Sequence, residues 1–235
     1  GNAAGWIVVT LGWGMAVFVA VWCVGEASGA HINPAVTLGL YAAGTFPVDG
    51  GLEVVAGYIM AQMAGAFAGA ALVLLLYWDH YAASNDPGAK LATFCTAPAI
   101  RRTWSNLFSE IVGTTVLVLA VLLAVEPSIS MAGEPAAGMA APSMKIGLGS
   151  LGALPVGLLV LSIGLSLGGT TGYAINPARD FAPRLAHALL PVPGKGASDW
   201  GYAWIPVVGP LVGGLLAAGI WMAIMETAPQ TVSAL

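Results

Sequence analysis

The tripeptide Asn-Pro-Ala occurs twice in this chain, at Asn33-Pro34-Ala35 and at Asn176-Pro177-Ala178. Asn is a preferred helix N-cap and Pro is best tolerated at the first helical position, so each triplet predicts the start of a helix. The N-terminus of a helix carries a partial positive charge. Two such helix starts placed inside a bilayer would form a pore or a binding site, and this duplication therefore constrains the fold more than any other feature.

The composition predicts a membrane protein. Apolar residues make up 58% of the chain and charged residues only 8%, whereas soluble domains carry roughly 25% charged residues. The 32 Gly are typical of closely packed membrane helices. The net charge of −4 and the lack of a basic stripe argue against a nucleic-acid partner. We therefore expect residues 1–235 to form one all-α membrane domain in a lipid bilayer.

Five segments are long and apolar enough to cross a bilayer, which takes about 20 residues. They are residues 6–25, 52–78, 107–125, 149–168 and 202–225. Two shorter helical segments, 33–42 and 176–190, begin at the triplets and are predicted to be re-entrant half-helices. The segments between the spans at 79–106 and 126–148 are predicted to be loops.

The two triplets mark an internal repeat, because Asn176 lies 143 residues after Asn33. The predicted division is a first repeat over 1–78, a loop over 79–106 and a second repeat over 107–235. Three spans separate the half-helices, so the second repeat should be inverted and the half-helices should enter from opposite faces. A complete inverted repeat needs a sixth, N-terminal span before Gly1. We expect that helix to be missing from this sequence, with a natural five-span protein as the alternative.

The residues around the triplets resemble the signatures of the major intrinsic proteins, the aquaporins and glycerol facilitators. The first signature is Ser28-Gly-Ala-His-Ile-Asn-Pro-Ala-Val-Thr37 and the second is Gly172-Tyr-Ala-Ile-Asn-Pro-Ala-Arg-Asp180. Asp180 directly after Arg179 is similar to the glycerol-conducting aquaglyceroporin branch, as are Tyr77, Arg184, Pro206 and Val207. The resemblance covers the chain from Trp6 to about Glu226.

The resemblance implies a selectivity filter formed by Trp13, Gly164, Tyr173 and Arg179. Water-specific members usually carry His at the position of Gly164, and Gly should leave space there. The best-known bacterial facilitators carry Phe at the position of Tyr173, so its hydroxyl leaves the substrate range open. Trp13 and Tyr173 would form an apolar wedge opposite the polar Arg179. An Arg at membrane depth is costly unless it is paired or functional, and we expect both Arg179 and Arg184 to be pore residues.

The pore midplane is predicted at the two triplets, where the Asn amides can donate hydrogen bonds into the lumen while their oxygens accept from backbone N–H groups. Non-helical backbone at membrane depth is tolerated where it lines a wet cavity. We therefore expect extended segments whose backbone carbonyls form a ladder. The predicted carbonyl residues are Gly29, Ala30, His31, Gly172 and Ala174.

Several residues are predicted to support the pore. In the family, a Glu at the position of Glu110 accepts N–H bonds from the second re-entrant loop. Asp180 lies in a first helical turn, where a carboxylate is favoured by the helix dipole, and its role is expected to be structural. His31 is expected to pack or hydrogen-bond, with gating as the alternative. The pairs Gly65/Gly69, Gly164/Gly168 and Gly209/Gly213 predict close helix contacts.

These features together predict a passive channel for glycerol and similar small uncharged solutes, with water also passing and protons and ions excluded. The alternative within the class is a water-preferring aquaporin. Remote alternatives are a secondary transporter and a non-conducting structural membrane protein. No catalytic constellation, cofactor motif or metal-ligand spacing is present in the sequence, so no enzyme activity is expected. The resemblance implies a homotetramer in the cell membrane.

Overall fold

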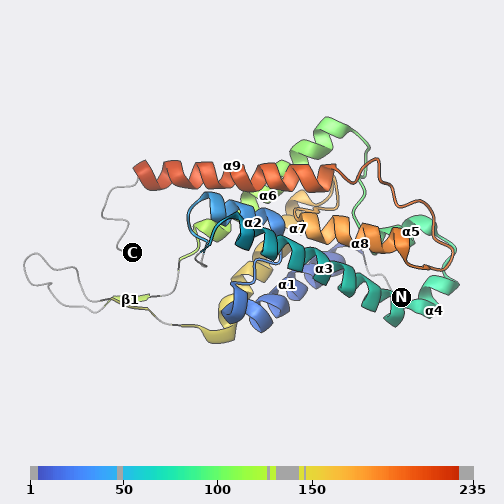
Figure 1. Cartoon of the computed structure of the whole chain (residues 1–235), viewed down its shortest axis with the longest axis horizontal. Helices are drawn as coiled ribbons and strands as arrows, with labels where there is room; N and C mark the ends of the chain where they lie inside the picture. Colours follow the sequence, from blue (N-terminus) through green and yellow to red (C-terminus); the bar gives the residue numbers. More distant parts are fainter. Residues whose placement is uncertain (1–4, 47–49, 126–127, 131–142, 146, 228–235) are drawn as a thin grey trace, which may run out of the picture.

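The computed structural model describes residues 5–46, 50–125, 128–130, 143–145 and 147–227. Five helical segments are long and apolar enough to cross a membrane (Figure 1). They are α1 (Trp6–Ser28), α3 (Leu52–Leu76), α6 (Thr103–Leu122), η1 with α7 (Gly149–Ala153 and Leu154–Leu167), and α9 (Ile205–Thr227). The five predicted spans are therefore confirmed, with shifts of a few residues at their ends. Most of the loop predicted at 126–148 lies outside the described residues.

Two shorter helices begin at the duplicated triplets. Helix α2 (Pro34–Ala42) has 9 residues and α8 (Pro177–Leu189) has 13. Each is capped by the triplet Asn, which adopts an extended conformation, and each has Pro at its first turn. At about 1.5 Å per residue, neither reaches across the roughly 30 Å of hydrocarbon in a bilayer. Figure 1 shows both lying between the long helices.

The regions predicted as loops contain short elements that the sequence reading missed. Helix α4 (Trp78–Ala83) begins at the last residue of the predicted span and continues into 79–106, and α5 (Pro87–Ala92) lies within that range. Strands β1 (Ser128–Ser130) and β2 (Ser143–Lys145) pair antiparallel within 126–148. The start of α5 carries the same signal as the triplets, because the Asp86 side chain accepts hydrogen bonds from the N–H groups of Gly88 and Ala89 before Pro87 opens the helix.

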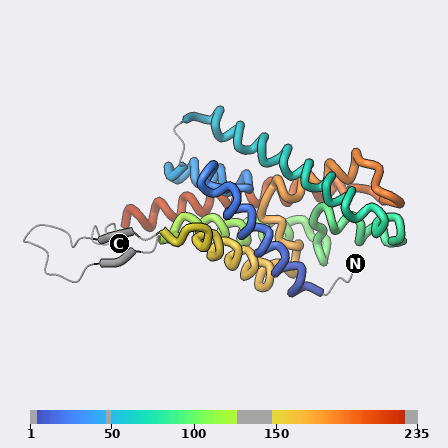
Figure 2. The backbone as a smooth tube through the Cα atoms, turned by 90° about the horizontal axis from the view of Figure 1, so that it is seen from below, coloured from blue at the N-terminus to red at the C-terminus, as the bar shows by residue number. Residues whose placement is uncertain are grey.

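The helix packing follows the sequence repeat (Figure 2). Helix α1 packs against α7, its counterpart in the second repeat. Helix α2 packs against α9, and α8 packs against α3, so each short helix contacts the long helix that follows the other triplet. Helix α6 also packs along α9. The two halves are thereby interlocked rather than placed side by side as separate domains.

Glycines allow α1 and α7 to cross at short distance. A Cβ added at Gly14 in α1 would lie 2.7 Å from the carbonyl oxygen of Gly157 in α7, and the converse distance is also 2.7 Å. The pairs Gly164/Gly168 and Gly209/Gly213 likewise have no room for a side chain without movement of their neighbours. Gly65 and Gly69 differ from the prediction, because no described atom lies within 4 Å of an added Cβ there. Close helix contacts are therefore present at Gly164/Gly168 and Gly209/Gly213, whereas Gly65 and Gly69 line the main cavity.

We expect Gly14→Ala to destabilise the folded protein by about 1–3 kcal/mol, the usual range for overpacking a tight contact. The clash is with backbone, which cannot rotate away. Thermal unfolding of the purified protein in detergent measures the effect. Gly12→Ala is the matched control, because Gly12 is in the same helix and has open space at its Cβ. Equal unfolding temperatures for the two variants would contradict the close α1–α7 crossing.

Candidate functional site

The two triplets are joined by reciprocal hydrogen bonds. The Nδ2 of Asn33 donates to the carbonyl of Ile175 at 2.8 Å, and the Nδ2 of Asn176 donates to the carbonyl of Ile32 at 2.9 Å. The side-chain oxygen of Asn33 accepts from Ala35 N, while that of Asn176 accepts from Ala178 N and Arg179 N. Each Asn side-chain amide thus donates one N–H to the opposite loop. Its second N–H can donate to a molecule in the cavity.

The segments before the triplets have an unusual backbone rather than the extended one that we predicted. Ala30 and Ile32 have φ of 47° and 45°, and Tyr173 and Ile175 have 38° and 42°. Left-handed φ is a genuine outlier for β-branched and bulky residues. The outliers recur at the same offset as the triplets. Gly29 and Gly172, at 70° and 76°, precede them in each segment. Neither segment is therefore a regular extended strand.

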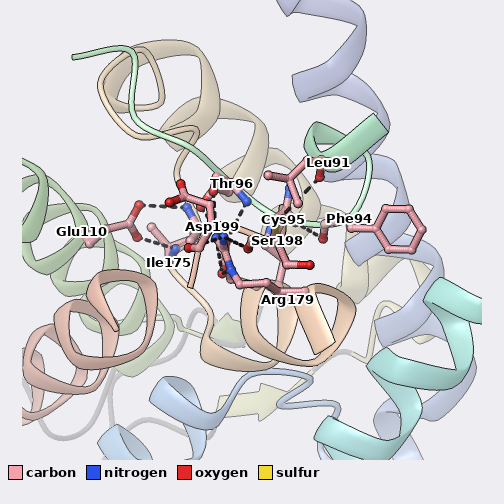
Figure 3. A network of polar contacts seen from close by, with 12 residues as sticks. Leu91, Phe94, Cys95, Thr96, Glu110, Ile175, Arg179, Ser198 and Asp199 are labelled. Carbon is pink, nitrogen blue, oxygen red and sulfur yellow. Dashed lines mark hydrogen bonds and ion pairs between the residues drawn. The ribbon is translucent and has the colours of Figure 1, made fainter. Parts of the chain in front are cut away.

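Glu110 holds the second of these segments from behind. It is fully buried in α6, and its carboxylate accepts from Ala174 N at 3.0 Å and from Ile175 N at 2.7 Å. Figure 3 shows Glu110 on one side of this network and Arg179 on the other. These bonds satisfy the backbone N–H groups of a strained segment, which leaves its carbonyls free to face elsewhere.

Asp180 is the centre of a buried clamp. Its carboxylate accepts from the N and Oγ1 of Thr96, each at 2.7 Å, and from Arg184 at 2.9 Å and 2.8 Å. Arg184 also donates to the carbonyls of Thr96, Ser198 and Asp199. The side chains of Asp180 and Arg184 are both 0% exposed. The clamp ties α8 to two loops, 93–102 and 190–204.

Arg184 is therefore not a pore residue, contrary to our expectation, because all of its donors face protein acceptors and it does not line the main cavity. Thr96 is a functional neighbour that sequence reasoning missed. In the sequence, Thr96 stands out only as a Thr in a Pro-containing loop. That pattern does not predict its hydrogen bond to Asp180, which lies 84 residues further along the chain. The adjacent Cys95 thiol is also buried, and burial raises its pKa to about 12, so it adds no charge beside Arg179 at neutral pH.

Three of the four predicted filter residues lie together. The Arg179 guanidinium carbon is 3.9 Å from the centroid of the Trp13 ring, a close cation–π contact. Its Nη1 donates to the carbonyl of Phe94 at 3.5 Å (Figure 3). Trp13, Tyr173 and Arg179 all line one cavity of about 880 Å³. The Arg179 guanidinium therefore stacks on the Trp13 ring, and Tyr173 lines the same cavity.

Gly164 lies behind Tyr173 and is not among the residues that line the cavity. A Cβ there would lie 2.7 Å from Tyr173 Cζ and 2.8 Å from Thr10 Cγ2. Tyr173 also packs edge-on against Trp6, whose Nε1 donates to the Gly164 carbonyl at 2.9 Å. The space that Gly164 leaves is thus occupied by the end of the Tyr173 side chain rather than by open pore.

The predicted carbonyl residues divide between two hollows. Gly29, Ala30, His31 and Ala174 line the main cavity, as do both triplet asparagines. Gly172 instead lines a smaller hollow beside Trp6. Of the other triplet residues, Ala178 reaches the main cavity, whereas Pro34, Ala35 and Pro177 are buried at the helix starts.

A cavity between long apolar helices that is lined by helix N-termini and one arginine is typical of a multi-pass membrane channel. The sequence profile described as "Major intrinsic protein" matches residues 1–221. The chain belongs to the major intrinsic protein family, whose members are channels and not enzymes.

The chain is similar to curated bacterial relatives over most of its length. It is 53% identical over 221 residues to the probable glycerol uptake facilitator protein of Thermotoga maritima, covering 94% of this chain and 85% of the relative. It is 49% identical over 211 residues to the glycerol uptake facilitator protein of Bacillus subtilis, covering 90% and 69%. Among solved structures, the Plasmodium falciparum aquaglyceroporin matches with a TM-score of 0.76 at 30% identity, covering 96% and 85%. The fold is therefore aquaglyceroporin-like.

Proposed function

We propose that residues 1–235 form a passive channel for glycerol and similar small uncharged solutes in the cell membrane, with water also passing. The observation that carries the proposal is the contact of Arg179 with the Trp13 ring beside Tyr173. A polyol has a carbon side and a hydroxyl side. A guanidinium stacked on an aromatic ring can complement both sides of a polyol, because the rings beside it offer apolar surface and the guanidinium has donors in a fixed geometry and no acceptor.

Exclusion of protons and cations follows from the same residues. Helices α2 and α8 are taken to be re-entrant half-helices that enter from opposite membrane faces, with their N-termini meeting at the triplets. Their dipoles and Arg179 make the potential at the centre positive. The reciprocal bonds of Asn33 and Asn176 support this arrangement. A sixth span before α1 stays a prediction, and so does assembly as a homotetramer with one pore in each subunit.

In proteoliposomes, we expect glycerol-driven swelling at a rate well above that of protein-free vesicles, together with measurable osmotic water flow and no proton leak. Stopped-flow light scattering measures the first two, and a trapped pH dye measures the third. Arg179→Leu is the informative variant, because it removes the donors and the positive charge. We expect it to lose glycerol preference and to gain proton or cation leak. Rapid water flow without glycerol flux in the wild type would favour the water-preferring alternative instead.

A further inference from the structure

Two lysines that do not line the main cavity bind the backbone around the C-terminal end of α8. The first is Lys195, whose Nζ donates to the carbonyls of His187, Ala188 and Leu190, each at 2.7 Å. A helix leaves the carbonyls of its last turn unpaired, and an ammonium has three protons to give them. A positive charge is also favoured at this end of the helix dipole. Lys195 therefore caps α8 from the turn that follows the helix.

The second lysine, Lys90, binds the same turn from helix α5. Its side chain is buried, with the residue only 4% exposed, and its Nζ donates to the carbonyls of Pro193 and Gly194. Figure 1 shows α5 next to the C-terminal end of α8. Burying an ammonium is costly unless acceptors receive its protons, so the contact favours one position of the turn. The turn 190–195 is consequently tied to α5 by one lysine and to α8 by the other.

The two helices joined in this way carry the two partners of one contact at the constriction. Phe94 follows α5, and its N–H donates to the carbonyl of Leu91 in that helix. Arg179 lies in the first turn of α8, and its Nη1 donates to the Phe94 carbonyl at 3.5 Å (Figure 3). Val192 of the turn belongs to the same buried cluster as Phe94. A separation of 3.5 Å is at the long end for a hydrogen bond, so a small shift of either helix removes this contact.

We propose that Lys90 and Lys195 are positioning residues for the constriction, because they fix the end of α8 against α5 and so hold the Arg179 guanidinium at the Phe94 carbonyl. The inference rests on the proposed glycerol channel function, in which Arg179 offers donors in a fixed geometry. The Asp180 clamp acts at the start of α8, whereas the lysines act at its end. A polyol must meet the guanidinium in one orientation, whereas a water molecule can turn to suit it. Losing a lysine should therefore reduce glycerol permeability more than water permeability.

The test uses Lys90→Met and Lys195→Met in the full chain, which keep an unbranched side chain and remove the ammonium. The readout is the glycerol-to-water permeability ratio in proteoliposomes. A variant that merely folds less well loses both permeabilities together and keeps this ratio. We expect each variant to lower the ratio by about 2- to 10-fold, the effect of losing one hydrogen bond. Arg102→Gln is the matched control, because it removes one positive charge from an exposed residue, and its ratio should equal that of the wild type.

The same two changes are then made together with Arg179→Leu. If the lysines act through Arg179, they should alter the ratio by less than twofold in that background, because effects that pass through one shared contact are not additive. A wild-type ratio in both single variants would overturn the positioning role alone, and so would an equal fall with and without Arg179. Wild-type vesicles that take up no glycerol would overturn the proposed function and this inference with it. The lysines lie on different elements, so one variant suffices if the other does not insert.

Discussion

Replacing Gly164 with histidine is expected to reduce glycerol permeability by at least about tenfold while water permeability falls much less. Any side chain at this position meets Tyr173 Cζ and Thr10 Cγ2 at under 3 Å. Tyr173 lines one cavity with Trp13 and Arg179, so a ring displaced from Gly164 into that cavity would narrow it. A rise of about 1.4 kcal/mol in the barrier to permeation lowers the flux about tenfold. The larger solute loses its path first.

The measurement is the glycerol-to-water permeability ratio of wild type and variant in the same liposomes at matched protein content. Gly164→Ala should give a smaller change in the same direction, because it introduces the Cβ clash without an imidazole. Gly169→Ala is the control, since no described atom lies within 4 Å of an added Cβ there. A ratio that stays constant or rises in Gly164→His would show that this position does not shape the constriction.

Asp180→Asn is expected to be strongly destabilising, costing about 3–5 kcal/mol. The carboxylate is the ionic partner of Arg184, and both side chains are fully buried. The variant leaves the Arg184 guanidinium charged and uncompensated. It also weakens the bonds from Thr96, so the loop that carries the Phe94 carbonyl should lose its fixed position against Arg179. We therefore expect a large fall in thermal stability and loss of glycerol flux.

Thermal unfolding in detergent, followed by reconstitution of the surviving protein, measures both effects. Arg101→Gln is the matched control, because it breaks the Arg101–Asp199 ion pair, in which the Arg101 side chain is 58% exposed. Exposed pairs contribute about 0–1 kcal/mol. An Asp180→Asn variant as stable as Arg101→Gln would mean that the buried clamp does not hold the loops together.

The spans and helix starts were predictable because their signals are local. Asn33 and Asn176 cap the helices that follow them, and the bonds involve residues only two or three positions away. The apolar runs needed for membrane spans are likewise continuous in sequence. Asp86-Pro87 is a local helix-start signal of the same kind that our sequence analysis did not use, and helix α5 begins there. The resemblance to the family supplied the filter residues, which spacing alone would not have selected.

The partners of these residues across the fold were decided by tertiary structure alone. The sequence by itself determined a membrane protein with five spans, two short helices at the triplets and an arginine at membrane depth. Only the folded chain placed Thr96 against Asp180, lodged the Tyr173 ring over Gly164 and paired Arg184 inside the protein instead of the pore. It also left His31 Nε2 and Gln62 Oε1 buried with no hydrogen-bond partner among the described residues. The physical reason is that a polar side chain at membrane depth must find a partner, and that partner can lie anywhere along the sequence.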